Sequence, residues 1–388
     1  MTASPSTARE LRTASLLRVL RAVHDAPAPP TRADVTRQLR LGRGTATVLV
    51  ADLKERRLLT EADTGARQGP GRPTAHLVPH PDGPLVLAAA VTHDGWTLDT
   101  VELGAGIVRT AEGGHDSRRT ARVLDAVAEA CRAVVADLPG RVGGFALSVP
   151  ATVDRGRVAQ ASLLGWSDLD ALAPLRWLGV PMTLVNDATA AGLGEARRGA
   201  ARGHEVALHL HADAGVGGTL LIGGFPVRDA HGAGGEFGHM PLAGGSRPCH
   251  CGAYGCWDLE VGNLALVDDP APRMSVRRAA ARVLDRAHDG DPEALERVAR
   301  VATALGRGIG ALVNAHDPEL VTLSGSAATV AALAPGALHE AYLSALMRFR
   351  RAAPPPVHLT TLGGRGQRLG TAELAFDLLL TEPLIAGR

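Results

Sequence analysis

The chain has few cysteines and no long apolar segment. Its 388 residues include four cysteines, three of them within eight positions, so a framework of disulfides is not expected. No apolar run approaches the roughly 20 residues that a membrane span needs, and the N-terminal stretch lacks the apolar core of a secretory signal. We therefore expect a cytoplasmic, nucleoid-associated protein with no membrane partner.

A large net charge is also missing, because 41 basic and 40 acidic side chains leave a formal charge of +1. This balance conceals an asymmetry. Residues 1–80 contain 13 basic and 7 acidic side chains and carry +6, so the remaining 28 basic and 33 acidic side chains carry −5. A basic segment joined to an acidic body indicates that nucleic acid binds at one end of the chain.

The basic segment has the pattern of a winged helix-turn-helix. Three helices, two short strands and the wing loop between the strands are expected at 10–24, 31–39, 45–57, 58–61, 74–78 and 62–73. The apolar positions expected to hold the helices together are Leu11, Leu16, Leu17, Leu20, Val23, Val48, Leu49 and Leu53.

Side chains suited to DNA occupy the third helix and the wing. Arg43, Thr45 and Thr47 stand at the start of that helix, where recognition helices read the major groove, and Arg72 stands in the wing, where it suits a narrow minor groove. Lys54, Arg56 and Arg57 are expected beside the DNA backbone. A unit that only packs helices together is the alternative.

From Leu85 onward strands and helices alternate, which indicates an open α/β domain with its ligand at the strand ends. We therefore divide the chain into residues 1–80 and 81–388. Asp94-Gly95 predicts a hairpin turn, and the glycine-rich loop 213–218 fits either a hairpin or a phosphate loop. Further elements are expected at 96–103, 118–137, 142–149, 181–185, 275–288 and 293–316, with helices opening at Asp187 and near Leu369.

A metal site is predicted by His239, Cys249, Cys251 and Cys256. Three thiolates and one imidazole form a closed tetrahedral set for Zn²⁺, with no position left for chemistry, so one structural Zn²⁺ per chain is expected. Glycines within the cysteine run let ligands so close in sequence converge on one ion. Free cysteines beside a core histidine are the alternative.

These residues carry a resemblance to a known family. Glu236-Phe237-Gly238-His239 followed by Cys-x-Cys-Gly-x-x-Gly-Cys at 249–256 resembles the paired signature of the ROK family of repressors, open reading frames and kinases. The resemblance extends to the head, with its Gly-Arg-Pro wing, and implies a two-lobed, actin-like ATPase fold. It also implies that His239 is both a zinc ligand and a sugar contact, and that Glu236 holds sugar hydroxyls. Asp258 stands where the family has Glu, and Glu260 is an alternative for that contact.

The same resemblance assigns Asn186 and Asp187 as the family's sugar contact and catalytic base, and Leu164-Gly165-Trp166 as the loop over the sugar. A carboxylate at this place suits proton removal from a sugar hydroxyl. Without the other motifs, Asn-Asp at a strand-to-helix junction would indicate an ordinary helix cap.

The family's kinases carry an Asp-x-Gly-Gly-Thr pattern for ATP at the end of the first strand, and residues 90–94 of this chain depart from it. Ala90 stands at the Asp position and Thr92 at the first glycine, so no carboxylate is expected there to help place Mg²⁺. We therefore expect a transcriptional repressor rather than an enzyme, with Asp187 a vestigial base. It would act as a homodimer or homotetramer on an inverted-repeat operator and respond to a sugar or sugar phosphate. An active sugar kinase with an added head, and a protein-binding module, are the alternatives.

Overall fold

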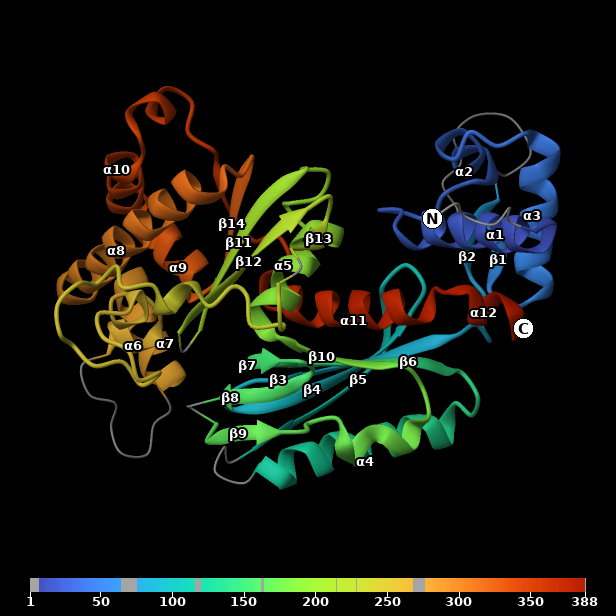
Figure 1. Cartoon of the computed structure of the whole chain (residues 1–388), viewed down its shortest axis with the longest axis horizontal. Coiled ribbons are helices and arrows are strands. Elements are labelled where there is room, and N and C mark those ends of the chain that lie inside the picture. Colours follow the sequence, from blue (N-terminus) through green and yellow to red (C-terminus); the bar gives the residue numbers. More distant parts are fainter. Residues whose placement is uncertain are drawn as a thin grey trace.

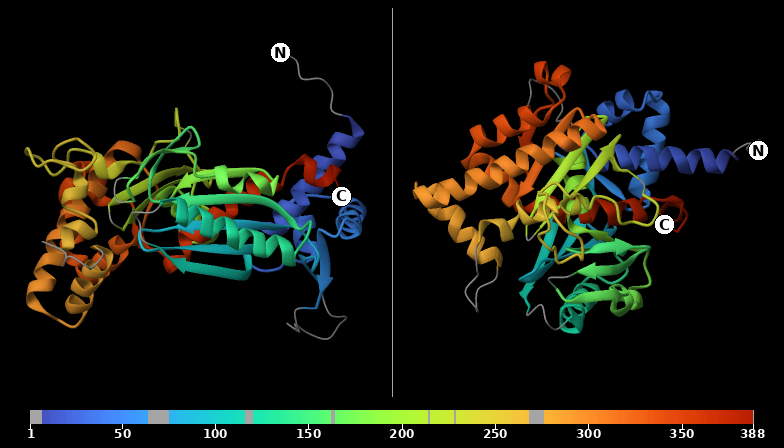
Figure 2. Two further views of the ribbon diagram at one scale, coloured as in Figure 1. Left: turned by 90° about the horizontal axis from the view of Figure 1, so that it is seen from below. Right: turned by 60° about the vertical axis from the view of Figure 1, so that its left-hand side comes forward.

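The computed structural model describes residues 7–63, 75–115, 120–161, 164–213, 215–227, 229–267 and 276–387. The molecule is elongated, with the N-terminal head at one end, a group of helices at the other, and two sheet-containing lobes between them (Figure 1 and Figure 2). In the described part of the chain, no helix is both long enough and apolar enough to cross a membrane.

The head contains the three predicted helices and two paired antiparallel strands. Thr7 with Glu10, and Thr31 with Asp34, form reciprocal capping boxes that fix the starts of the first two helices. The third helix begins at Arg43, two residues earlier than predicted, and the second strand begins at His76. The elements are α1 (Ala8–His24), α2 (Arg32–Gln38), α3 (Arg43–Glu55), β1 (Leu59–Ala62) and β2 (His76–Pro79).

Two of the predicted packing positions in the head are wrong. Leu11 and Val48 are 59% and 54% exposed, because with 3.6 residues per turn each points away from the face that carries the buried residues of its helix. Leu16, Leu20 and Leu53 are buried as predicted and form the centre of the head.

The first lobe is built on a mixed sheet in the order β10-β6-β3-β4-β5. All seven residues of β3 are buried, because helices cover both faces of the sheet. Val86 and Ala88 face the helix α11 (Gly366–Leu379), whereas Leu87 and Ala89 face α4. The elements are β3 (Leu85–Val91), β4 (Gly95–Glu102), β5 (Gly106–Gly114), α4 (Thr120–Asp137), β6 (Val142–Val149) and β10 (Met182–Asn186), with a small sheet of β7 (Thr152–Asp154), β8 (Arg157–Ala161) and β9 (Trp166–Leu169).

The second lobe has a sheet in the order β13-β12-β11-β14-β15, with helices packed over one face (Figure 1). Leu208, Leu210 and Leu323 point from this sheet into the core that those helices complete. The elements are β11 (Val206–Ala212), β12 (Val216–Ile222), β13 (Phe225–Pro226), α6 (Asn263–Leu266), α7 (Val276–His288), α8 (Pro292–His316), β14 (Leu320–Gly325), α9 (Ser326–Leu333), α10 (Pro335–Ala345) and β15 (Val357–Leu359).

Two helices, α5 (Asp187–Arg198) and α11 (Gly366–Leu379), lie against each other between the lobes (Figure 1). They approach closely because both are glycine-bearing at the crossing. A Cβ on Gly370 would lie 1.7 Å from the carbonyl oxygen of Ala190, and one on Gly194 would lie 2.2 Å from that of Gly366. This close packing makes α5 and α11 one unit.

The C-terminus completes the head. After α11 the chain forms α12 (Glu382–Ala386), whose Ile385 is buried in the same apolar core as Leu16 and Leu20 of α1. The carbonyl oxygen of Ile385 also accepts a hydrogen bond of 2.6 Å from Arg56. The head is therefore held by both ends of the chain.

Candidate functional site

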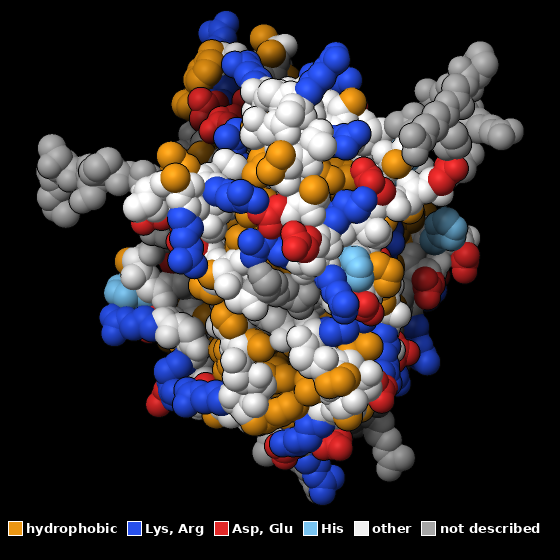
Figure 3. Space-filling model, turned by 90° about the vertical axis from the view of Figure 1, so that its right-hand side faces the viewer, with side chains coloured by type: hydrophobic (Ala, Val, Ile, Leu, Met, Phe, Trp, Pro, Cys, Tyr) orange, Lys and Arg blue, Asp and Glu red, His pale blue; other side chains and the backbone are white. Residues whose placement is uncertain are grey.

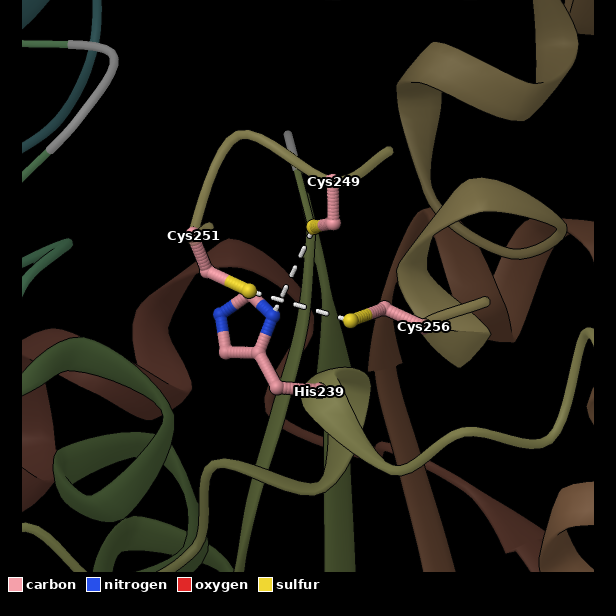
Figure 4. A group of neighbouring side chains, drawn as sticks. All are labelled: His239, Cys249, Cys251 and Cys256. Carbon is pink, nitrogen blue, oxygen red and sulfur yellow. Dashed lines mark hydrogen bonds between the residues drawn. The ribbon is translucent and has the colours of Figure 1, made fainter. Parts of the chain in front are cut away.

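The four predicted metal ligands lie together (Figure 4). One ligand atom from each of His239, Cys249, Cys251 and Cys256 lies within 4.8 Å of the others. The Cys249 Sγ–His239 Nδ1 distance is 3.8 Å and the Cys251 Sγ–Cys256 Sγ distance is 3.7 Å. An ion with Zn–S bonds of about 2.3 Å has tetrahedral edges of roughly 3.8 Å, so the spacing matches a zinc site. The Sγ–Sγ distance between Cys251 and Cys256 is too long for a disulfide.

The local backbone makes this convergence possible. The Cys249 amide donates to the Ala253 carbonyl at 2.8 Å, and the Gly252 amide donates back to the Cys249 carbonyl at 3.0 Å, which closes a tight turn. Gly252 and Gly255 have φ of 96° and 65°, values that disfavour a side chain. Burial and the neighbouring thiols raise the pKa of Cys256 to about 12, and a metal ion bound here would favour its thiolate form.

A cavity of about 330 Å³ opens between the two lobes, beside the loop of residues 249–256 that carries the three cysteines (the cysteine loop). We call it the central cavity. Its volume is within the range of small-molecule sites. All five predicted sugar contacts line it, namely Asn186, Asp187, Glu236, His239 and Asp258. The cavity therefore brings together residues that are far apart in the sequence. They come from β10, from the cysteine loop and from the turn after β11.

Asn186 caps α5 as well as lining the central cavity. Its side-chain oxygen accepts the amides of Ala188 at 2.8 Å and Thr189 at 3.1 Å, and its amide nitrogen donates to the Ala151 carbonyl at 3.0 Å. One amide hydrogen is left for a ligand. The cap and the cavity position are thus compatible.

Asp187 follows directly, at the first residue of α5. Burial raises its pKa to about 7, and the charges of Asp213 and Glu236 add to the shift, against opposing hydrogen bonds from backbone amides. A carboxyl group with a pKa near neutrality suits proton transfer.

His239 lies between the metal cluster and the central cavity. Its Nδ1 faces Cys249, whereas its Nε2 lies 3.9 Å from Glu236 Oε2. A metal on Nδ1 would leave the Nε2 hydrogen directed to the side of the cavity where Glu236 lies. His250 also lines the cavity, and nothing in the sequence pattern had singled it out.

Asp258 and Glu260 are separated by the structure. Asp258 is buried on the wall of the central cavity, where its Oδ1 accepts the Val216 amide at 2.5 Å. Glu260 lines a different cavity beside α8, so Glu260 is excluded as the substitute for the family's Glu. The shorter Asp side chain is committed in part to the backbone of the turn after β11.

One predicted cavity element is wrong. Leu164 and Trp166 are buried in the core of the first lobe and do not line the central cavity. Gln160 and Ala161 of β8 occupy that wall instead. His93, His211 and Asp213 also line the cavity and were not identified from the sequence as cavity residues; His93 and Asp213 follow strands β3 and β11, His211 lies near the end of β11, and strand ends were the signal available.

The ATP side of the fold carries no carboxylate at Ala90, which is buried near the end of β3. Asp94-Gly95 forms part of the hairpin between β3 and β4, as predicted. The glycine-rich loop is the hairpin joining β11 to β12. A second cavity of about 450 Å³ lies beyond it and shares His211 and Asp213 with the central cavity.

The head presents the start of α3 to solvent. Arg43, Thr45 and Thr47 are exposed, and Gly42 caps the helix without a side-chain bond, which leaves first-turn amides for an outside acceptor. The fourth predicted contact, Arg72, lies outside the described residues.

The basic side chains at the far end of α3 have partners within the protein. Lys54 pairs with Glu61 at 2.7 Å, and Arg56 pairs with Asp52. The end of the molecule that carries the head shows Lys and Arg side chains interspersed with acidic ones (Figure 3). Among the described residues of the head, basic side chains therefore alternate with acidic ones and form no continuous basic surface.

Comparisons with known proteins agree with this architecture. Residues 105–377, more than half of the chain, match the ROK family. A solved ROK family transcriptional regulator, described as a homolog of the E. coli MLC protein, superposes with a TM-score of 0.75 and 20% identity over 97% of this chain and 100% of that chain. At that identity the likeness shows the fold, which is the two-lobed sugar-kinase fold with a head.

Both repressors and sugar kinases are found among the similar proteins. A xylose repressor of Bacillus spizizenii is 24% identical over 304 residues, 77% of this chain and 78% of the repressor. A glucokinase of Streptomyces coelicolor is 26% identical over 215 residues, 51% of this chain and 68% of the kinase. With its zinc-type cluster, inter-lobe cavity and family match, the chain belongs to the ROK family.

Proposed function

We propose that this protein is a sugar-responsive transcriptional repressor that binds operator DNA through its head and releases it when a sugar fills the central cavity. We further propose that it acts as a homodimer or homotetramer on an inverted repeat, with one structural Zn²⁺ per chain bound by the four-residue cluster. Similarity to a xylose repressor and the exposed first turn of α3 support this proposal.

The observation that carries the proposal is that one helix reaches both the central cavity and the head. Helix α5 begins with Asp187 in the cavity and ends, about 18 Å along its axis, with Arg198. Arg198 donates a hydrogen bond of 2.9 Å to the carbonyl oxygen of His24, the last residue of α1. A ligand that moves the start of α5 therefore acts on a helix bonded to the head.

Two buried side chains, His24 and Glu373, and the largely buried Arg198 stabilise this contact; we call these three residues the junction cluster. Arg198 Nε donates to Glu373 Oε1 at 2.6 Å, and His24 Nε2 lies 3.1 Å from Glu373 Oε2. His24 Nδ1 lies 3.0 Å from the Gly104 amide, and His24 Nε2 lies 3.0 Å from the Arg198 guanidinium as well as near Glu373. The cluster joins the head to α5, α11 and the first lobe.

The release mechanism follows from linkage. A sugar that prefers one arrangement of the lobes shifts the population of head positions, and its effect on DNA affinity cannot exceed its preference between the two arrangements. Because α5 is packed tightly on α11, a displacement at Asp187 is passed to Arg198 and Glu373 together.

A sugar kinase is the second candidate. It is supported by Asp187, whose pKa is raised to about 7, and by similarity to a glucokinase. Ala90 argues against it, because phosphoryl transfer depends on a metal that neutralises developing charge and this position supplies no carboxylate.

The test begins with selection of bound duplexes from random DNA, followed by fluorescence anisotropy of the selected operator with and without saturating sugars. We expect specific binding that a sugar weakens, together with no sugar-dependent ATP consumption in the same sample. Equal affinity for operator and random DNA would overturn the regulator. Turnover at ordinary kinase rates, on the order of 1 to 100 per second, would establish the kinase.

Arg198→Ala tests the route between the two sites. We expect this variant to bind sugar in calorimetry but to lose the effect of sugar on DNA affinity. Arg300→Ala is the matched control, since Arg300 is an exposed arginine of α8 whose partner is Glu296. A normal sugar response in Arg198→Ala would show that the signal does not pass through the junction cluster.

A further inference from the structure

Several carboxylates line the central cavity. Four of its lining residues are acidic, namely Asp187, Asp213, Glu236 and Asp258, and none of its described lining residues is Lys or Arg. A phosphorylated ligand would have to enter this field with no Lys or Arg on the described cavity wall to pair with it; the nearest such charge is Arg277, which acts on His93 and His211 from the second cavity.

Three described backbone amides beside the cavity already have acceptors within the protein. In the hairpin between β11 and β12, the Val216 amide already donates to Asp258, the Gly218 amide to the Gly235 carbonyl at 3.0 Å, and the Asp213 amide to the Gly215 carbonyl at 2.9 Å. A turn that cradles phosphate presents such amides outward. Here an internal carboxylate takes the place of an external anion.

Asp213 occupies the wall that the central cavity shares with the second cavity. Asn263 holds it in place, because its side-chain amide donates to Asp213 Oδ1 at 2.8 Å and its backbone amide donates to the Asp213 carbonyl at 2.8 Å. The bond from the Asn263 side chain goes to Oδ1 of Asp213 and not to its second carboxylate oxygen, Oδ2. Arg277 on α7 lines the second cavity and not the central one.

Two further observations at this wall indicate a missing donor. Asp187 and Asp213 line the same cavity, and burial together with the charge of Asp213 raises the pKa of Asp187. His93, which also lines the cavity, has a buried Nδ1 with no hydrogen-bond partner. Two acceptors of like charge and an unpartnered ring nitrogen are the surroundings that a ligand ammonium group satisfies.

We propose that the central cavity binds an unphosphorylated sugar that carries a protonated amino group, and that Asp213 together with Asp187 holds the ammonium. This inference rests on the proposed function and narrows it: phosphorylated sugars are excluded as effectors. An ammonium has three hydrogens to donate, and a charge-assisted bond to carboxylate is stronger than a hydroxyl bond at the same place.

The test is calorimetric titration of the zinc-loaded full chain at neutral pH with four probes: glucose, 2-amino-2-deoxyglucose, 6-amino-6-deoxyglucose and glucose 6-phosphate. At least one amino sugar is expected to bind about tenfold more tightly than glucose, which corresponds to the gain from one charge-assisted bond. Glucose 6-phosphate is expected to bind more weakly than glucose. Tight binding of the phosphate, or no preference for either amine, would overturn the inference.

The variant Asp213→Asn tests whether Asp213 causes the preference for amino sugars over glucose. The amide oxygen can still accept from Asn263, so the turn is retained, while the charge is lost. The ratio of amino-sugar affinity to glucose affinity is expected to fall to near one in this variant and to stay high in Glu260→Gln, whose carboxylate lies in the other cavity. Thermal unfolding and zinc content verify that both variants are folded.

The two proposals fail in distinguishable ways. If glucose and its amines bind equally and still release DNA, the regulator stands and the amine site is wrong. If the amines bind with the expected preference but change neither operator affinity nor DNA release, the ligand class stands and the regulatory function is wrong. An unchanged preference in Asp213→Asn would remove Asp213 as the deciding residue.

Discussion

Replacing Glu373 by Gln removes the one carboxylate of the junction cluster, at the place where the head meets the body. Glu373 is fully buried, and Arg198 is 11% exposed. The Gln side chain fills the same space but places an amide against the Arg198 guanidinium or the His24 ring, so one buried donor faces another and the guanidinium loses its counter-charge.

The magnitude follows from the pKa of Glu373. Burial alone would raise this pKa, but His24 and Arg198 overcome that effect and lower it from 4.5 to about 2. At about 1.4 kcal/mol per pKa unit, the ionised carboxylate contributes roughly 3 kcal/mol, consistent with the 3–5 kcal/mol typical of a broken buried pair. Since the folded pKa is below the unfolded one, this stability is present above pH 4.5 and is lost as pH falls toward 2.

Hydrogen exchange measured by mass spectrometry reports the effect where it occurs. At neutral pH, the amides of residues 16–23 in α1 should exchange roughly 100-fold faster in Glu373→Gln than in the wild type, the equivalent of about 3 kcal/mol of opening free energy. Peptides of β11 and β14 should change little. Glu382→Gln, an exposed glutamate of α12, is the control. Unchanged exchange in α1 would refute the energetic role of the cluster.

Three other predictions concern the metal, the cavity and the DNA surface. Elemental analysis should find one zinc per chain, and Cys251→Ser should lose it; zinc retained in that variant would remove the site. Because the pKa of Asp187 is raised to about 7, this group lowers stability as pH rises from about 4 to 7, and Asp187→Asn should flatten the dependence of the unfolding temperature on pH over that window; an unchanged slope would contradict the shift. Arg43→Ala should weaken operator binding by about 1 to 3 kcal/mol and lessen its salt dependence, whereas Arg300→Ala should not; equal losses would exclude a specific contact by α3.

Much of the local structure could be predicted from short-range sequence. Thr31 and Asp34 are three residues apart, so the capping box and the start of α2 follow from the chain alone. The apolar run of β3 and the hairpin at Asp94-Gly95 depend likewise on neighbours in sequence. The metal cluster was accessible for the same reason, since three of its ligands lie within eight residues and their glycines fix the turn.

The buried face of each head helix could not be predicted completely in this way. Leu11 and Val48 lie on another side of α1 and α3 from the buried residues, because apolar side chains occur around more than one face of these helices and only the packing selects the face that is buried. The choice between Asp258 and Glu260 has the same character. Both follow the last cysteine closely, and only the path of the chain after Trp257 places one in the central cavity and the other beside α8.

The sequence by itself therefore determined the units of this protein: a capped helical head, alternating strands and helices, and a turn whose cysteines can bind a metal ion. The tertiary structure decided how they act on one another. His24 and Glu373 are 349 residues apart, and Asp187 and Asp213 are brought together only when β10 and β11 end at the same cavity. Such contacts depend on the packing of whole elements, which no local pattern encodes.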